Sequence, residues 1–279
     1  MIGKVPPTAA ERLAALDFWP SVPAIEPIAG GRTNENFRVR AGGQLYFARV
    51  GQDLPHHRIS RANELRCLTL ASEAGVAPHV LFAGTGLLVT EYFEGRTLVQ
   101  GDPVDDDTLA RLGVALRRLW SATAPADLPA FDPVDICQGY VDALPAGTHD
   151  TRRRRKIEAI LVAVPPRDNR WLIHADLIPE NVIVASDRIA IVDWEYAGRG
   201  DPVVDVAAVA MNFGLDRRQA ALLGDEAGIG DGRRIAAFEK VMALREALWC
   251  DTQRHFVGVR GDLDAYTELC WGRIDAMPE

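Results

Sequence analysis

The pattern of apolar and polar positions divides the chain into two parts of different character. Over the first 91 residues, short apolar runs are bounded by turn residues, which is typical of β-strands. These runs cover residues 24–28, 45–50, 80–83 and 87–91. The last two flank the turn Gly84-Thr85-Gly86 and predict a hairpin. One helical pattern, over residues 57–74, lies between the strands.

Beyond residue 99 the apolar positions mostly recur with helical spacing. The predicted helices cover residues 107–121, 153–164, 203–213, 217–223, 233–256 and 263–274. Inside this helical part, the apolar runs 182–185 and 188–192 flank a Ser186-Asp187 turn and predict a second hairpin. The chain is therefore predicted to combine a strand-rich first third with a mainly helical remainder.

The most informative segment is residues 171–205, WLIHADLIPENVIVASDRIAIVDWEYAGRGDPVVD. It contains an His-x-Asp-x-x-x-x-Asn loop and, at the end of the predicted hairpin, Asp193. A hairpin returns the end of its second strand to the loop before its first, so Asp193 is expected near Asp176 and Asn181. Phosphoryl transfer needs a carboxylate to accept the proton of the attacking hydroxyl, which suits Asp176, and oxygen ligands for magnesium, which suits Asn181 and Asp193. An ordinary hairpin with polar loop ends is the alternative.

In these residues the segment resembles the aminoglycoside phosphotransferase and choline kinase superfamily, whose members share a bilobal, protein-kinase-like fold. The ending Asp-Trp-Glu-Tyr-Ala-Gly-x-Gly-Asp-Pro-x-x-Asp is most similar to the bacterial choline/ethanolamine kinase branch. The resemblance implies an α+β fold with a small antiparallel-sheet N-terminal lobe and a larger, mainly helical C-terminal lobe. Residues 1–91 would form the nucleotide-binding lobe, residues 92–98 the hinge, and residues 99–279 the lobe with the catalytic loop and the acceptor site.

The same resemblance assigns roles within the catalytic segment. Asp176 would be the catalytic base, and His174 of the same loop is assigned to the catalytic residues with it. Asn181 and Asp193 would hold the metal ion. Ala175 departs from the Gly or Asn that is usual in the family, and its small side chain is expected to keep the backbone geometry.

The N-terminal third carries a second resemblance. Residues 30–37, Gly-Gly-Arg-Thr-Asn-Glu-Asn-Phe, resemble the Gly-Gly-x-Thr-Asn-x-Asn-[Phe/Tyr] pattern of the choline kinase branch. Paired glycines let a backbone approach phosphates closely, although the pattern alone is more often a simple turn. The resemblance also places Arg49 where protein kinases carry a lysine, paired with a helix glutamate, and implies that the hinge backbone binds adenine. The residues thus assigned to the nucleotide are Gly30, Gly31, Thr33, Asn34, Asn36, Arg49, Glu64, Glu91 and Phe93.

Several of these positions also have simpler interpretations. Arg49 is alternatively a surface cation on a strand. Arg58 and Arg61 are interpreted as solvated charges at the start of a helix. Asp205 is expected to hold the catalytic loop rather than a substrate.

The acceptor is the least determined part of the site. Aromatic faces closed by carboxylates bind quaternary ammonium groups, and the candidates here are Glu195, Tyr196 and Trp249; a core position is the alternative for Trp249. The resemblance favours an ATP- and magnesium-dependent kinase of a cationic amino alcohol, choline or ethanolamine. The alternatives are an aminoglycoside, thiamine or another hydroxylated metabolite as acceptor, and a nucleotide-binding pseudokinase. ATP and GTP are not distinguished.

Composition limits the partners. A net charge of −8 argues against general nucleic-acid binding and suits a cationic substrate. The basic run of residues 152–156 is interpreted as a solvated helix start in preference to an anion contact. The sequence has no run of 18 or more apolar residues, so no membrane span is predicted, and no secretory signal is recognised. Four cysteines without CxxC spacing predict reduced thiols in a cytoplasmic protein; a homodimer is left open.

Overall fold

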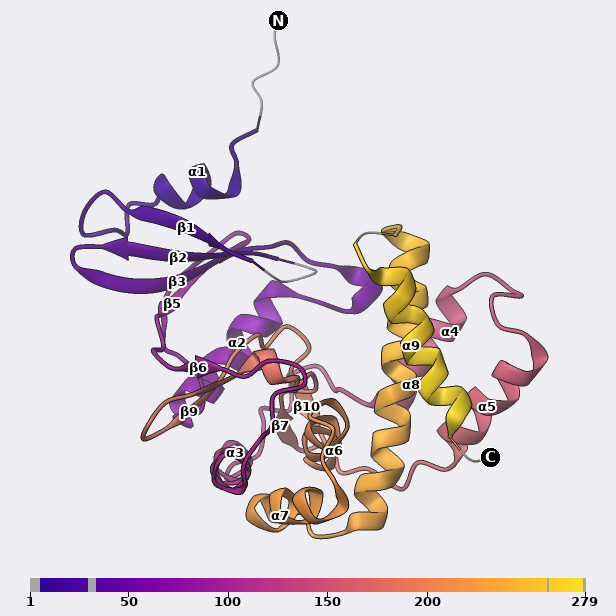
Figure 1. The fold of residues 1–279 in the computed structure, drawn as a ribbon. Coiled ribbons are helices and arrows are strands. Elements are labelled where there is room, and N and C mark those ends of the chain that lie inside the picture. Colours follow the sequence, from indigo (N-terminus) through magenta and orange to yellow (C-terminus); the bar gives the residue numbers. More distant parts are fainter. Residues whose placement is uncertain (1–5, 30–33, 260, 278–279) are drawn as a thin grey trace, which may run out of the picture.

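The computed structural model describes residues 6–29, 34–259 and 261–277 of the 279-residue chain. Its N-terminal part contains a five-stranded antiparallel sheet with the strand order β1-β2-β3-β5-β4 (Figure 1). All four strands predicted from the sequence are present, and β2 is added between β1 and β3. The strands are β1 (Ala24–Ile28), β2 (Glu35–Ala41), β3 (Gln44–Val50), β4 (Val80–Gly84) and β5 (Leu87–Glu91).

One face of this sheet is covered by α1 (Ala9–Ala14), a short helix that the sequence pattern did not predict. Thr8 caps its start, and Glu11 completes a capping box by bonding back to the Thr8 amide. Leu13 is fully buried with Val39 and other apolar side chains of β2 and β3. The cap and this burial explain how a helix of six residues persists.

The predicted helix over residues 57–74 is shorter in the structure. Pro55–His57 forms a 3-10 turn (η1), Arg58 then adopts a left-handed conformation with φ of 58°, and α2 begins at Arg61 and runs to Glu73. Ser60 caps α2 by accepting from the Asn63 amide. Residues 58–60, the first of them left-handed, therefore separate η1 from α2, and apolar spacing does not reveal this break.

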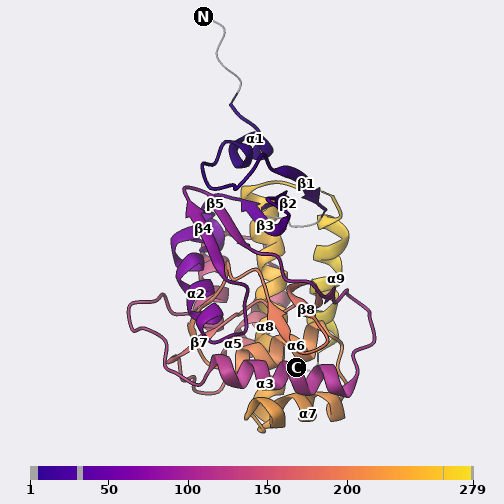
Figure 2. The same cartoon turned by 90° about the vertical axis from the view of Figure 1, so that its left-hand side faces the viewer.

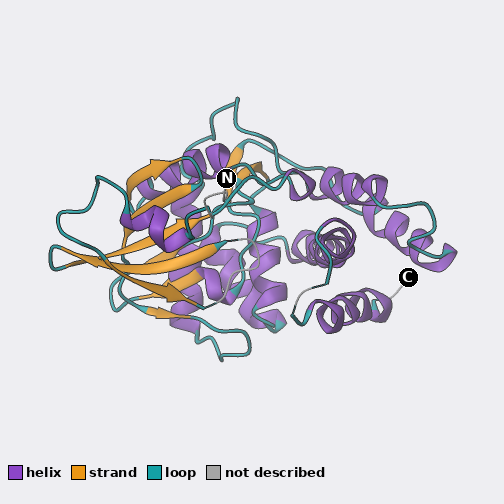
Figure 3. Ribbon diagram, turned by 90° about the horizontal axis from the view of Figure 1, so that it is seen from above, coloured by secondary structure: helices purple, strands orange, loops and turns teal. Residues whose placement is uncertain are grey.

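The C-terminal part is mainly helical, as predicted. Figure 2 shows α3 and α7 lying side by side at the end far from the sheet, and the long α8 packs along α9, α4 and α6. Seen from above, the strands gather toward one side and helices extend to the other (Figure 3). The helices are α3 (Asp106–Leu119), α4 (Pro133–Ala143), α5 (Thr151–Val162), α6 (Val203–Asn212), α7 (Arg217–Ala227), α8 (Gly232–Phe256) and α9 (Leu263–Ala276).

Two small sheets lie between the larger parts. The predicted hairpin is present as β8 (Val182–Val184) and β9 (Ile189–Ile191), and β6 (Arg96–Thr97) pairs with β8. β7 (Trp171–Ile173) pairs with β10 (Gly198–Gly200). The chain therefore has the predicted α+β, kinase-like architecture, and the loop of residues 174–181 runs between these two sheets.

The basic run at the start of α5 is only partly solvated. Arg152 and Arg155 are exposed, as expected. The guanidinium of Arg153, however, lies 4.5 Å from the ring centre of Trp271, and Lys156 donates to the Asp275 carbonyl at 2.9 Å. These contacts fasten α9 to α5, so two of the five residues of the run serve packing within the fold.

Among the described residues no helix is long and apolar enough to cross a membrane. The four cysteines are all unpaired and buried: Cys67, Cys137, Cys250 and Cys270.

Candidate active site

The loop after β7 carries Asp176, and its backbone is fixed by Asp205 from α6. The two carboxylate oxygens of Asp205 accept from the amides of His174 at 3.0 Å and Ala175 at 2.8 Å. Asp205 is fully buried, and burial raises its pKa to about 7 while the two hydrogen bonds oppose that rise. These contacts agree with the expectation that Asp205 holds the catalytic loop.

Two residues of the site have left-handed backbone conformations. Ala175 has φ of 67° and Asp193 has φ of 64°. For a residue with a Cβ this conformation costs about 1–2 kcal/mol, and Gly or Asn adopts it more easily. Ala175 therefore keeps the backbone path at the cost of strain, which the Asp205 hydrogen bonds offset.

Hydrogen bonds join the loop of residues 174–181 to the end of the β8–β9 hairpin. Val192, the residue before Asp193, donates its amide to the Asn181 carbonyl at 2.9 Å, and the Asn181 side chain donates to the Asp176 carbonyl at 2.9 Å. His174 is fully buried and donates from Nε2 to the Val192 carbonyl at 2.9 Å. Burial lowers the pKa of His174 to about 4, so the ring is neutral. Through this hydrogen bond His174 connects the loop of Asp176 to the backbone just before Asp193.

Arg49 on β3 is buried, and its guanidinium forms an ion pair with Glu64 of α2. The same nitrogen lies 3.4 Å from an Asp193 oxygen. The structure thus brings the predicted pair together and directs it toward Asp193. The alternative of a surface cation is excluded by burial.

The interpretation of Arg61 as a solvated charge is wrong. Its side chain is 13% exposed, and it binds Glu64 at 2.8 Å and Glu195 at 2.9 Å. Asn34 also donates to Glu195 at 2.9 Å. Glu195 is buried in this network, so the structure places it with predicted nucleotide residues instead of Trp249. Arg58, by contrast, is exposed as expected.

The remaining predicted residues of the N-terminal loop divide between described and undescribed parts. Asn36 lies on β2 directly opposite Arg49. Gly30, Gly31 and Thr33 lie outside the described residues.

The charges around Asp193 favour a bound cation. Burial, the Glu195 carboxylate and further carboxylates raise the pKa of Asp193, and Arg49 opposes the rise. Four carboxylates face three guanidinium groups here: Asp176, Asp193, Glu64 and Glu195 against Arg49, Arg61 and Arg245. The Asn181 amide nitrogen is already engaged, which leaves its oxygen as a ligand atom. An oxygen pair with excess negative charge fits Mg²⁺ held by one or two side chains and by phosphates.

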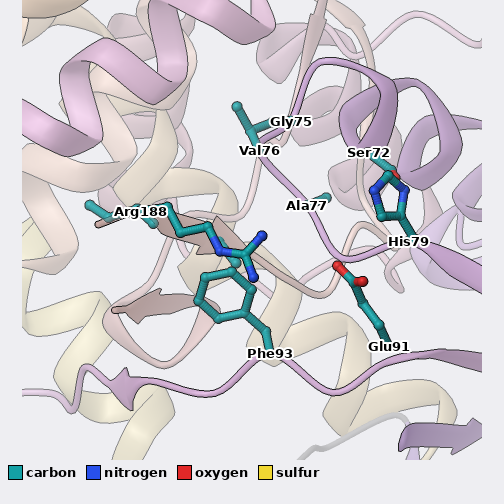
Figure 4. Close-up of a pocket in the computed structure, with 10 residues that line it drawn as sticks. Ser72, Gly75, Val76, Ala77, His79, Glu91, Phe93 and Arg188 are labelled. Atoms are coloured by element: carbon teal, nitrogen blue, oxygen red, sulfur yellow. The ribbon is translucent and has the colours of Figure 1, made fainter. Parts of the chain in front are cut away.

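A small cavity lies beside the predicted hinge (Figure 4). Its volume is about 50 Å³, far below the roughly 300 Å³ at which ligand pockets begin. The Glu91 carboxylate projects toward it, and Phe93 carries the guanidinium of Arg188 on its ring at 4.6 Å. The Glu91 amide donates to the His79 carbonyl at 3.0 Å. An adenine contact at Glu91 would therefore have to use its carbonyl oxygen.

On the other side of Asp176, aromatic side chains gather around α8. Trp249 donates from Nε1 to the Tyr196 hydroxyl at 2.8 Å, and its ring stacks on His57 with centroids 5.1 Å apart. One turn before Trp249, Arg245 binds Asp176 at 3.0 Å and lies 4.4 Å from the ring centre of Tyr196. We call Tyr196, Trp249, His57 and Arg245 the acceptor-side cluster. Two predicted residues meet here, while Arg245 and His57 were not anticipated.

Known proteins are similar to this chain in sequence. Residues 24–238 match the phosphotransferase enzyme family. Protein LicA of Haemophilus influenzae is 28% identical over 203 residues, which are 70% of this chain and 60% of that protein. Viomycin phosphotransferase of Streptomyces vinaceus is 28% identical over 175 residues, 54% of this chain and 61% of that protein. The chain thus spans about three fifths of the length of these two relatives.

A solved structure extends the similarity. The choline/ethanolamine kinase family protein of Mesorhizobium loti is 28% identical, with a TM-score of 0.71. The match covers 95% of this chain and 92% of that chain. Both the sheet and the helical part are therefore shared.

Proposed function

The chain belongs to the phosphotransferase enzyme family, and we propose that it transfers the γ-phosphoryl group of ATP to the hydroxyl of a cationic amino alcohol such as choline or ethanolamine. The observation that carries this proposal is the convergence of Asp176, Asn181 and Asp193, joined by hydrogen bonds and flanked by the Arg49–Glu64 pair. These are the parts that phosphoryl transfer requires: a proton acceptor, oxygen ligands for a metal and a fixed cation.

In the proposed reaction, the acceptor oxygen attacks the γ-phosphorus while the bond from that phosphorus to ADP breaks. Asp176 orients the hydroxyl and takes its proton. Asn181 and Asp193 would hold Mg²⁺, which when bound offsets the charge of the phosphates. Arg49, fixed by Glu64, would face the phosphate oxygens. Residues 92–98 would form the hinge, with the residues before them in the nucleotide lobe and those after them in the acceptor lobe.

The acceptor class is supported by two facts. The Mesorhizobium loti protein of the same fold is described as a choline/ethanolamine kinase family protein. The acceptor-side cluster also presents aromatic faces next to Asp176, which suits an organic cation. Viomycin phosphotransferase is a relative of similar identity, so antibiotic acceptors remain the second candidate.

A coupled ADP-release assay tests the proposal. Choline, ethanolamine, thiamine, kanamycin and viomycin would each be compared with a no-acceptor control, with ATP or GTP and with or without Mg²⁺. We expect release that depends on choline or ethanolamine. In Asp176→Asn this release should fall by about 10²–10⁴-fold, the usual contribution of a general base.

The matched control is Asp187→Asn, which makes the same chemical change at the exposed turn of the same hairpin and should leave turnover intact. Near wild-type turnover in Asp176→Asn would remove Asp176 from the mechanism. Binding of ATP without turnover on any acceptor would favour a pseudokinase.

A further inference from the structure

Arg245 is a buried cation placed directly on the proposed catalytic base. The residue is 6% exposed, and its NH1 lies 3.0 Å from an Asp176 carboxylate oxygen. Its guanidinium carbon lies 4.4 Å from the ring centre of Tyr196 and 5.6 Å from that of Phe131. Within residues 6–29, 34–259 and 261–277, its Nε has no hydrogen-bond partner.

This arrangement is the one in which aromatic side chains bind an organic cation. Arginine does not lose its charge in proteins, so burial requires a compensating carboxylate. For Arg245 that carboxylate is Asp176, the group whose lone pair the proposed reaction uses. While the guanidinium engages one oxygen of this carboxylate, that oxygen is not free to accept a proton from a hydroxyl, and a hydroxyl cannot take the place that the guanidinium fills beside it.

We propose that Arg245 sets acceptor specificity by occupying the acceptor's own position. Without acceptor, its guanidinium lies over Tyr196 and Phe131 and engages Asp176. A small organic cation replaces the guanidinium on these rings, and only then does the hydroxyl of that cation reach the carboxylate. This inference rests on the proposed function and deepens it: acceptors are alcohols with a cationic group compact enough to take the place of a guanidinium.

A consequence concerns water, the competing acceptor. In hydrolysis, a water oxygen attacks the γ-phosphorus, the bond to ADP breaks, and Asp176 takes the proton, which gives ADP and phosphate. Water carries no charge with which to displace Arg245. The arginine therefore suppresses ATP hydrolysis until a cation arrives, and it acts as a positioning residue through Asp176.

The test that uses the unaltered protein measures ATP hydrolysis with tetramethylammonium chloride, a cation without a hydroxyl. We expect it to stimulate hydrolysis relative to sodium chloride at equal concentration, because it displaces Arg245 and leaves room for water at Asp176. Inhibition, or no difference between the two salts, would overturn the inference. This assay needs no acceptor, so its result is separate from the question of whether choline or ethanolamine is phosphorylated.

Substitutions supply the second arm. Arg245→Met keeps a long side chain without charge, and it should raise acceptor-free hydrolysis and lower the choline KM, each by about tenfold, which is about 1.4 kcal/mol. Arg245→Lys keeps a cation and should restore most of the suppression. Tetramethylammonium should no longer stimulate Arg245→Met. If Arg245→Met instead loses turnover and acceptor binding together while its unfolding temperature is unchanged, Arg245 binds the acceptor and the inference is wrong.

Discussion

The two aspartates at the centre of the site each face an arginine, and the two arginines are held in different ways. Arg49 extends from a strand of the sheet and is paired with the buried Glu64, so its 3.4 Å approach to Asp193 is a secondary contact. Arg245 extends from α8 and has Asp176 as its ionic partner at 3.0 Å, with aromatic rings around it. If Asp193 bound a metal ion, Arg49 would keep its place. If Asp176 turned to a substrate, Arg245 would lose its counter-ion.

The difference separates a preorganised half of the site from an exchangeable half. A phosphate-binding cation is most effective when it is fixed before the reaction, because no reorganisation is then needed. A group in the acceptor position has the opposite requirement, since it must leave. The physical distinction between the two arginines is a second buried carboxylate. Arg49 has one in Glu64, and Arg245 has none among the described ion pairs.

Removal of the fixing carboxylate tests the preorganised half and has the largest expected effect on stability. In Glu64→Gln, the buried guanidinium groups of Arg49 and Arg61 lose their shared counter-ion. Breaking a buried pair from one side typically costs about 3–5 kcal/mol. We expect a loss of this size in the free energy of urea unfolding, together with weaker ATP binding by calorimetry.

The control for this substitution is Glu26→Gln, which removes the partner of Arg38 from an exposed strand pair. Exposed pairs contribute about 0–1 kcal/mol, so the control should unfold almost as the wild type does. Equal, small losses in both variants would mean that Arg49 is not held by Glu64, and the contrast with Arg245 would disappear.

The same contrast marks what the sequence could predict. Asp176, Asn181 and Asp193 were placed together correctly because a hairpin of ten residues joins them, and short hairpins have few possible geometries. The Arg49–Glu64 pair came from resemblance to a family, and the structure contains it. Strand-like and helical spacing predicted the strand-rich first third and the helical remainder, and the kinase-like fold came from the same resemblance.

Arg245 was not predicted because its contact with Asp176 spans 69 residues. Which face of α8 meets the loop of Asp176 depends on how the helix crosses the domain, and the spacing of apolar residues along α8 does not predict that crossing. Arg61 was misjudged for a related reason. A charged residue in the first turn of a helix is usually solvated, and the partner that buries Arg61, Glu195, is 134 residues away in the sequence. Helix α4 was not predicted. Glycine is unfavourable inside a helix, and Gly139 stands in the middle of α4, whereas Pro133 is at its first position, where proline is tolerated. In the structure the guanidinium of Arg58 fills the space that a side chain at position 139 would need.

A pH titration sharpens the comparison on the acceptor side. His57 is buried beneath Trp249 and donates to Gln253 at 2.5 Å, and its Nδ1 has no partner among the described residues. Burial lowers the pKa of His57 from its ordinary 6.5 to about 4. The folded protein thus binds fewer protons than the unfolded chain in this window, so stability falls as the pH drops from about 6.5 toward 4. The full effect is about 3 kcal/mol.

The measurement is the free energy of urea unfolding of wild type and His57→Gln between pH 4 and 7.5. The stability difference between the two proteins should shrink by about 3 kcal/mol toward low pH, because the glutamine does not titrate. His174 shares the direction of shift and contributes equally to both proteins. His255→Gln, at an exposed position of α8, is the control and should follow the wild-type slope. Parallel curves for wild type and His57→Gln would show that the neutral ring does not support the cluster.

The smallest expected effect comes from a single hydroxyl and decides whether the cluster serves the acceptor. Tyr196→Phe keeps the ring face next to Arg245 but removes the acceptor of the Trp249 Nε1 hydrogen bond. A lost hydrogen bond of this kind costs about 1 kcal/mol, or about fivefold in affinity. The KM for the alcohol should rise by about that factor while the KM for ATP stays unchanged, because Arg49 and Glu64 lie in the other half. An equal rise in both KM values would mean that the Trp249–Tyr196 hydrogen bond supports the whole site. The division of the site into a fixed half and an exchangeable half would then be wrong.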